Sequence, residues 1–136
     1  MRVKEIMHHV TRVSSDTTVS DAAEMMDQKF IGSVLIEKDD KIMGIMTERD
    51  ILKKIVAKRE NPEVLRVKDI MTYPIITVDA NAHILDACTK INRHRIRRLI
   101  VIENGEVIGK VTSNSIARNI KFSLAKGTSV YTRPEY

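Results

Sequence analysis

The chain contains two copies of one sequence pattern, and this internal repeat restricts its fold more than any other feature. Residues 44–50 read Gly-Ile-Met-Thr-Glu-Arg-Asp, and residues 109–115 read Gly-Lys-Val-Thr-Ser-Asn-Ser, at an offset of 65 positions. Upstream, residues 3–7 read Val-Lys-Glu-Ile-Met, and residues 67–71 read Val-Lys-Asp-Ile-Met. A repeat of this length indicates two similar structural units that bury a core by packing against each other.

Each copy predicts the same series of secondary-structure elements. A short β-type run at residues 10–13 is matched by residues 75–78. Apolar residues then recur at helical spacing in both copies, at Val19, Ala22, Ala23 and Met26 in the first and at Ile84, Ala87, Cys88 and Ile91 in the second. We expect Thr18 or Asp16 to cap the first of these helices, and Asn81 to cap the second.

A β-hairpin and a second helix complete each copy. Asn104-Gly105 separates two apolar runs and is a strong hairpin signal, and residues 38–41 hold the same place in the first copy. The second helix is expected to begin at the threonine of each repeated motif. The fold class is therefore α/β, with two β-α-β-β-α repeats packed sheet to sheet.

The repeats set the expected boundaries. We place the first repeat at residues 1–58 and the second at residues 67–125, with a charged, proline-containing linker at residues 59–66. Residues 126–136 show little periodicity and are assigned to a C-terminal tail.

Composition excludes several classes of protein. No apolar run is long enough to cross a membrane, and the single cysteine cannot form an internal disulfide, so we expect a cytoplasmic protein without membrane contact. A net charge of +5 is compatible with phosphate-bearing partners. An aromatic content of 4% leaves few rings on which single-stranded nucleic acid could stack.

Motifs for catalysis and metal binding are missing from the sequence. It contains no phosphate-binding Walker loop, no nucleophile elbow and no pair of carboxylates at a catalytic spacing. Histidine, cysteine and acidic residues do not occur at the spacing of metal ligands. We therefore expect neither enzymatic activity nor a bound metal nor a required cofactor.

The repeated threonine motif has two interpretations. Backbone N–H groups in the first turn of a helix that begins at Thr47 can bind a phosphate, and the Asp50 carboxylate can accept both hydroxyls of a ribose. Alternatively, Thr47 and Asp50 form a capping box that only stabilises the helix. The second copy has Ser115 in place of Asp50, and one hydroxyl cannot accept a diol in this bidentate way.

These residues resemble the cystathionine β-synthase (CBS) domain. The shared pattern is Val-Lys-Asp-Ile-Met-Thr, then Ile-Thr-Val, an alanine-containing helix, Leu-Ile-Val-Ile-Glu-Asn-Gly and Gly-x-x-Thr, and it occurs twice between Val3 and about Ile120. A tandem pair of this kind is called a Bateman module. The resemblance implies a pseudo-twofold pair of domains, usually dimeric, with adenosyl ligands bound in clefts between the copies.

The resemblance also implies which residues contact the ligand. The threonine motif of one copy faces the first strand of the other copy and the basic residues that open its second strand. One site would therefore contain Met46, Thr47, Asp50, Ile75, Ile76, Thr77, Arg97 and Arg98. A second, weaker site would contain Thr11, Arg12, Thr112 and Ser115, and it lacks the aspartate.

The sequence therefore predicts a non-catalytic sensor with one main adenine-nucleotide site per chain, which signals to an unidentified protein partner. AMP, ADP or ATP is expected in preference to S-adenosylmethionine, because Arg97 and Arg98 favour a phosphorylated ligand. Two alternatives stand beside this prediction. The arginine cluster at residues 93–98 could bind nucleic acid, or the chain could be a structural dimerisation module without a ligand.

Overall fold

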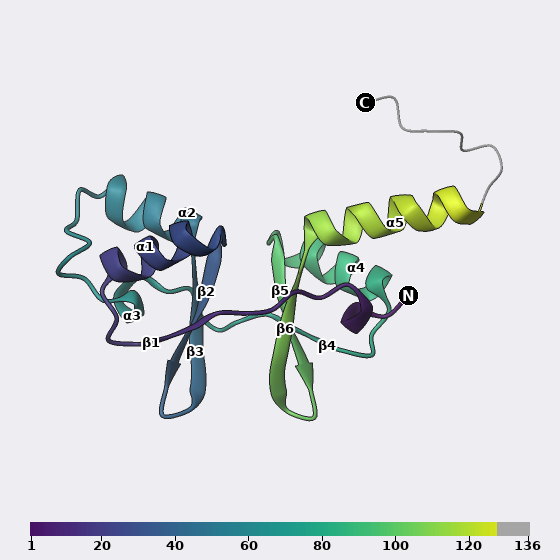
Figure 1. The fold of residues 1–136 in the computed structure, drawn as a ribbon, viewed down its shortest axis with the longest axis horizontal. Coiled ribbons are helices and arrows are strands. Elements are labelled where there is room, and N and C mark those ends of the chain that lie inside the picture. Colours follow the sequence, from purple (N-terminus) through teal and green to yellow (C-terminus); the bar gives the residue numbers. More distant parts are fainter. Residues whose placement is uncertain (128–136) are drawn as a thin grey trace. The chain divides into compact units, whose positions relative to one another are not determined.

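The computed structural model describes the backbone of residues 1–127 and the side chains of residues 1–120, so most of the expected tail lies outside the described residues. The chain forms two compact units (Figure 1). The Asp50 unit is Val10–Ile75, and the Ser115 unit combines Met1–His9 with the chain from Ile76 onward.

Both units contain the strands and helices that the repeat predicts, and each has one additional short helix, η1 (Val3–Glu5) or α3 (Val67–Ile70). In the Asp50 unit these are β1 (Arg12–Ser14), α1 (Val19–Lys29), β2 (Ser33–Lys38), β3 (Lys41–Thr47), α2 (Glu48–Ile51), the π-helical segment η2 (Leu52–Val56) and α3 (Val67–Ile70). In the Ser115 unit they are the 3₁₀-helix η1 (Val3–Glu5), β4 (Thr77–Asp79), α4 (Ile84–His94), β5 (Arg98–Glu103), β6 (Glu106–Thr112) and α5 (Ser113–Gly127).

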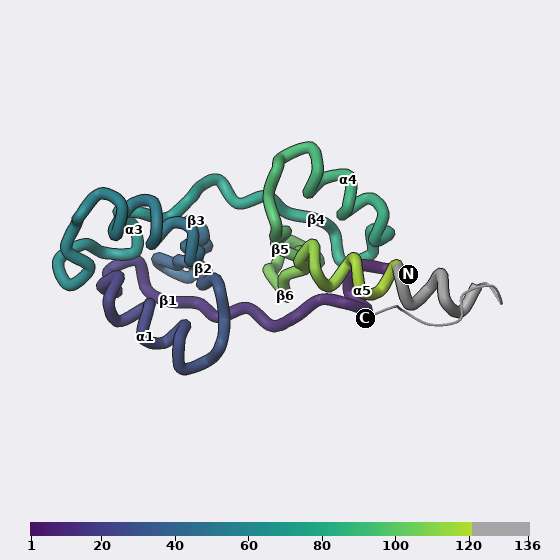
Figure 2. The backbone as a smooth tube through the Cα atoms, turned by 90° about the horizontal axis from the view of Figure 1, so that it is seen from above, coloured from purple at the N-terminus to yellow at the C-terminus, as the bar shows by residue number. Residues whose placement is uncertain are grey.

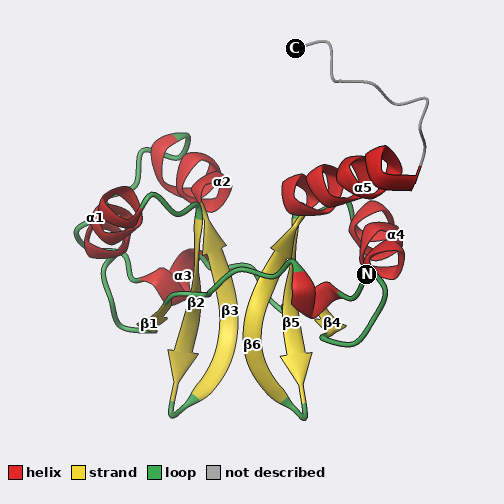
Figure 3. Ribbon diagram, turned by 45° about the vertical axis from the view of Figure 1, so that its right-hand side comes forward, coloured by secondary structure: helices red, strands yellow, loops and turns green. Residues whose placement is uncertain are grey.

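Each unit has one three-stranded sheet. The strand orders are β1-β2-β3 and β4-β5-β6, with a parallel first pair and an antiparallel second pair in both. Helices cover one face of each sheet, where the apolar core of the unit lies (Figure 3). The α/β class and the β-α-β-β-α order of both repeats are confirmed.

Both hairpins turn through two residues with positive φ. Asn104 and Gly105 have φ values of 53° and 79°, as the Asn-Gly pair predicts, and Asp39 and Asp40 have φ values of 53° and 62°. Aspartate and asparagine tolerate this left-handed conformation better than most residues other than glycine.

The helix caps are partly as predicted. The Thr18 hydroxyl accepts a hydrogen bond from the Asp21 amide at 3.1 Å and caps α1. The prediction for α4 was wrong, because this helix begins at Ile84 and its cap is His83, whose Nδ1 accepts from the Leu85 amide at 3.1 Å. Asn81 lies in the preceding turn, where its amide donates to Asp79.

The compact units are divided differently from the sequence repeats, because the first segment of each repeat packs in the other unit. The N-terminal segment, purple in Figure 2, belongs to the Ser115 unit. Val3 is fully buried there, and its amide donates to the Ala82 carbonyl. Val67 is fully buried in the Asp50 unit and donates to the Thr17 carbonyl. The expected linker residue Leu65 also packs against the core of the Asp50 unit.

A glycine of the repeated motif allows this packing in each unit. A Cβ atom at Gly44 would lie 2.8 Å from both the Met71 sulfur and the Thr72 carbonyl oxygen. A Cβ atom at Gly109 would lie 2.8 Å from the Met7 sulfur and the His8 carbonyl oxygen. Both contacts are shorter than van der Waals packing permits, so each glycine gives the incoming segment room to pair with the third strand.

Candidate functional site

Thr47 and Asp50 form a capping box at the start of α2. The Thr47 amide donates to Asp50 Oδ2 at 2.9 Å, and the Asp50 amide donates to Thr47 Oγ1 at 3.4 Å. The Thr47 hydroxyl also lies 3.3 Å from Asp50 Oδ2. The capping box is therefore present, and one oxygen of the carboxylate serves the helix.

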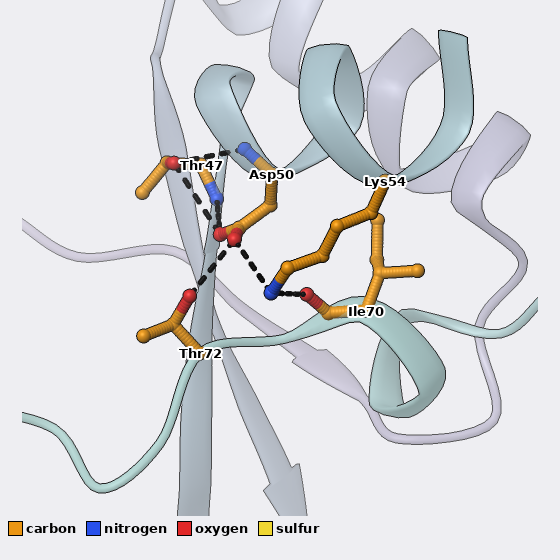
Figure 4. Close-up of polar contacts among 5 residues, drawn as sticks. All are labelled: Thr47, Asp50, Lys54, Ile70 and Thr72. Carbon is orange, nitrogen blue, oxygen red and sulfur yellow. Dashed lines mark hydrogen bonds and ion pairs between the residues drawn. The ribbon is translucent and has the colours of Figure 1, made fainter. Parts of the chain in front are cut away.

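The other oxygen of Asp50 has two further donors. Thr72 Oγ1 donates to Asp50 Oδ1 at 2.8 Å, and the Lys54 ammonium lies 3.0 Å from the same atom (Figure 4). Lys54 also donates to the Ile70 carbonyl at 2.8 Å, which ties the η2 segment to the end of α3. The Asp50 carboxylate is nearly buried, with 9% of its side chain exposed, whereas the Lys54 side chain is 42% exposed.

These contacts fill the acceptor capacity of Asp50. A carboxylate offers about four lone-pair positions, and four donor groups surround this one, two from Thr47, one from Thr72 and one from Lys54. A ligand hydroxyl can therefore reach Asp50 only by replacing a donor that is already in place.

Ser115 keeps the capping function without the charge. The Thr112 amide donates to Ser115 Oγ at 3.0 Å, and the Ser115 amide donates to Thr112 Oγ1 at 3.1 Å. The positions of Lys54 and Thr72 are held in this unit by Asn119 and His8. Asn119 donates to the Ser115 carbonyl. This hydrogen bond between neutral groups stands where the other unit has the Lys54–Asp50 ion pair.

The sheet register of the Ser115 unit determines which predicted residues share a face. Thr77, Ile100 and Lys110 are paired across the three strands, and Arg98 is paired with Thr112 two positions along β5. Side chains alternate between the faces of a strand, so Thr77, Arg98 and Lys110 lie on the same face. Arg97 is exposed and precedes β5, which begins at Arg98.

Lys110 is a candidate residue that the sequence reasoning missed. It lies two positions along β6 from the partner of Arg98, and burial together with the nearby Arg98 charge lowers the pKa of its ammonium. The signal was present in the repeat, because the first copy has Ile45 at this half-buried strand position.

The remaining predicted residues have varied positions. Met46 is fully buried in the core of the Asp50 unit, so only its backbone can contact a ligand. Ile76 packs against the core of the Ser115 unit, and its carbonyl accepts from the Ile100 amide at 3.0 Å. Ile75 is partly buried at the end of the Asp50 unit.

In the predicted weaker site, Arg12 lies 3.7 Å from the Glu37 carboxylate. The Thr11 carbonyl accepts a hydrogen bond from Leu35.

Each unit also has a groove whose lining includes none of the predicted ligand residues. The groove between α4 and α5 has a volume of about 390 Å³, and its apolar lining consists of Cys88, Ile91, Ile116, Ala117 and Ile120. The groove of the Asp50 unit, about 470 Å³, includes Ile31, Ile51 and Phe30, which is 96% exposed.

The part of the chain that the structure describes has neither a metal-binding cluster nor a membrane-spanning helix. The described residues contain no group of three or more His, Cys, Asp or Glu side chains that could hold a metal ion. None of their helices is long and apolar enough to cross a membrane.

Comparison with known proteins gives consistent matches. Residues 3–57 and 67–121 each match the family model of the CBS domain. A protein of Methanopyrus kandleri described as uncharacterized is 35% identical over 108 residues, which are 79% of this chain and 55% of that protein. Hypoxic response protein 1 of Mycobacterium tuberculosis is 34% identical over 112 residues, which are 82% of this chain and 78% of that protein.

The fold also matches solved structures. The hexameric CBS-CP12 protein from bloom-forming cyanobacteria has a TM-score of 0.83 at 26% identity, covering 96% of this chain and 78% of that one. This chain spans only about half the length of the archaeal relative.

Proposed function

The chain belongs to the CBS domain family and carries two copies of the domain, and from this we propose that it is a regulatory module that binds an adenine nucleotide. The proposed ligand is AMP, ADP or ATP, bound at one main site per chain. The module carries out no chemistry, and ligand binding is its signal to a partner protein.

The observation that carries this proposal is the difference between Asp50 and Ser115. Both residues cap a helix through the same hydrogen bonds, so capping alone does not require a carboxylate. Asp50 is nevertheless a nearly buried carboxylate, whose charge is compensated by Lys54 and Thr72 at Oδ1. Asp50 has a second oxygen, Oδ1, outside the capping box that can accept a ribose hydroxyl, whereas the single side-chain oxygen of Ser115 is already used by the cap.

Basic side chains of the Ser115 unit are the proposed phosphate contacts. Arg98 shares its sheet face with Thr77 and Lys110, whereas Arg97 is exposed and lies before the strand. We therefore assign the phosphate contact to Arg98 first. The family resemblance combines this face with Asp50 in one site, and a phosphorylated ligand is proposed over S-adenosylmethionine because the cations match phosphate.

Self-association is the second part of the proposal. The two grooves expose apolar surface at equivalent places in the two units, and Phe30 stands almost fully exposed beside one of them. A second copy of the chain would cover this surface, so we propose a homodimer. Sedimentation of the chain and of Phe30→Glu tests this, because the variant is expected to shift the chain toward monomer.

Thermal denaturation with a panel of compounds tests the ligand proposal. A ligand that binds only the folded state raises the melting temperature in a concentration-dependent manner. AMP, ADP or ATP is expected to do so, and S-adenosylmethionine and GTP are expected to act more weakly. A panel without any such rise, combined with a salt-dependent gel shift on nucleic acid, would replace the proposal by the nucleic-acid alternative.

A further inference from the structure

We propose that Thr72 is an internal competitor of the nucleotide. In the ligand-free chain its hydroxyl occupies the place on Asp50 Oδ1 that a ribose hydroxyl takes when the ligand binds. This inference rests on the proposed function, and it identifies Thr72 as a residue that sets the affinity of the site.

The two oxygens of Asp50 differ in the effect that losing their present hydrogen-bond donors would have. Oδ2 accepts from the Thr47 amide at 2.9 Å, and losing this contact would uncap α2. Oδ1 takes no part in the capping box, and its donors are the Thr72 hydroxyl and the Lys54 ammonium. The free-energy cost of displacing a donor is therefore lower at Oδ1 than at Oδ2.

Thr72 is the donor at Oδ1 that can leave. A ribose hydroxyl that replaces the Thr72 hydroxyl exchanges one neutral O–H donor for another at the same oxygen. Displacing Lys54 would instead leave a nearly buried carboxylate without its cation, which is strongly destabilising. Lys54 is also held by the Ile70 carbonyl, so it stays beside Asp50.

The Thr72 hydroxyl leaves by rotation of the side chain, because the backbone is fixed. The Thr72 amide donates to the Ile45 carbonyl at 2.8 Å, and the Ile45 amide donates to the Thr72 carbonyl at 3.0 Å. The absence of a side chain at Gly44 keeps this carbonyl close to β3. Thr72 itself is exposed, so its hydroxyl can move to another staggered rotamer and bond to water.

The Ser115 unit is consistent with this role. Where Asp50 is replaced by a serine, the position of Thr72 is held by His8. The His8 backbone still pairs with Lys110 at 2.8 Å and 2.9 Å, so the strand contact does not require a threonine. The threonine hydroxyl therefore occurs together with the carboxylate.

Competition of this kind lowers the measured affinity, and its removal should raise it. Thr72→Val keeps the shape of the side chain and removes only the donor. A tenfold change in affinity corresponds to about 1.4 kcal/mol, which is close to the contribution of one hydrogen bond to a charged group. We therefore expect Thr72→Val to bind ATP about tenfold more tightly than the unmodified chain.

Calorimetric titration of the full chain with ATP tests the inference, with Thr89→Val as the matched control. The Thr89 hydroxyl donates to the Leu85 carbonyl within α4, far along the sequence from the site. Tighter binding by Thr72→Val alone supports the competition, as does binding by Thr72→Val when the unmodified chain shows none. Equal or weaker binding by Thr72→Val, while the unmodified chain binds ATP, overturns this inference but not the proposed function. No binding by any variant overturns both.

A second measurement needs no substitution and covers a variant that fails to fold. The Thr72 methyl group of the unmodified chain is followed by NMR during addition of ATP. A change in its rotamer-dependent coupling at saturation is expected. An unchanged Thr72 rotamer in a chain that has bound ATP would overturn the inference.

Discussion

Lys54 and Asp50 form an ion pair that connects three parts of the Asp50 unit. The Lys54 ammonium lies 3.0 Å from Asp50 Oδ1 and donates to the Ile70 carbonyl at 2.8 Å. Lys54 belongs to the π-helical segment Leu52–Val56, whereas the equivalent residues of the Ser115 unit continue a regular α-helix. Irregular helical turns of this kind occur frequently at functional sites. This structural difference between the two units thus lies at Lys54, the cation that pairs with Asp50.

Removing the cation should destabilise the chain. We expect Lys54→Met to lower the free energy of unfolding by about 2 kcal/mol, less than for a fully buried pair because Lys54 is partly exposed. Urea denaturation measures the change. Lys53→Met is the matched control, because Lys53 is exposed and such changes usually stay within about 0.5 kcal/mol. Equal effects of the two substitutions would show that the ion pair contributes nothing.

Lys110 should produce a pH-dependent effect on stability. Its pKa is lowered in the folded chain by burial and by Arg98, so between the folded pKa and the ordinary value of 10.5 the unfolded chain binds more protons. Lys110 therefore reduces stability fully below its folded pKa, and the reduction fades as the pH rises toward 10.5.

Lys110→Ile, which copies Ile45 of the other unit, should accordingly be more stable at pH 7. The expected gain is roughly 0.5–1 kcal/mol, a range that allows for solvent screening of a half-exposed group. Urea denaturation at a series of pH values checks the sign. A gain that grows with rising pH would contradict the assignment.

The packing of the repeat segments can be tested with two valine substitutions. Val3→Ala should weaken the Ser115 unit and Val67→Ala the Asp50 unit, each by roughly 2 kcal/mol, because both side chains are fully buried there. Hydrogen exchange resolves the effects by residue. Faster exchange at residues 10–57 in Val3→Ala would mean that each segment packs with its own repeat instead.

Much of the fold could be predicted from the sequence because the local sequence signals agreed with the repeat. The pair Asn104-Gly105 fixed one hairpin, and its repeat partner located a turn at Asp39-Asp40 that has no glycine. The Thr18 cap followed from its position before an apolar stripe. Asn81 was a wrong choice because cap preference does not determine the first residue of a helix, and His83 can also accept the amide hydrogen bond.

The contacts around Asp50 could not be read from the sequence. Thr72 is 22 positions away, and it reaches the carboxylate only because the segment after α3 packs beside β3. A repeat shows that two segments are alike, but not which unit each one joins. Lys110 could have been found from the sequence. It stands at the repeat position that Ile45 holds in the other copy, and a lysine is unusual at a half-buried strand position.

The central claim is that Asp50 binds an adenine nucleotide at one main site per chain, and calorimetric titration with ATP and AMP tests it most directly. Asp69→Ala is the control, because Asp69 caps α3 by accepting from the Arg66 amide and has no proposed ligand contact. We predict one site per chain, an affinity that Asp50→Ala lowers at least about tenfold, and no change in Asp69→Ala. Two equal sites per chain, or an unchanged affinity in Asp50→Ala, would contradict the claim.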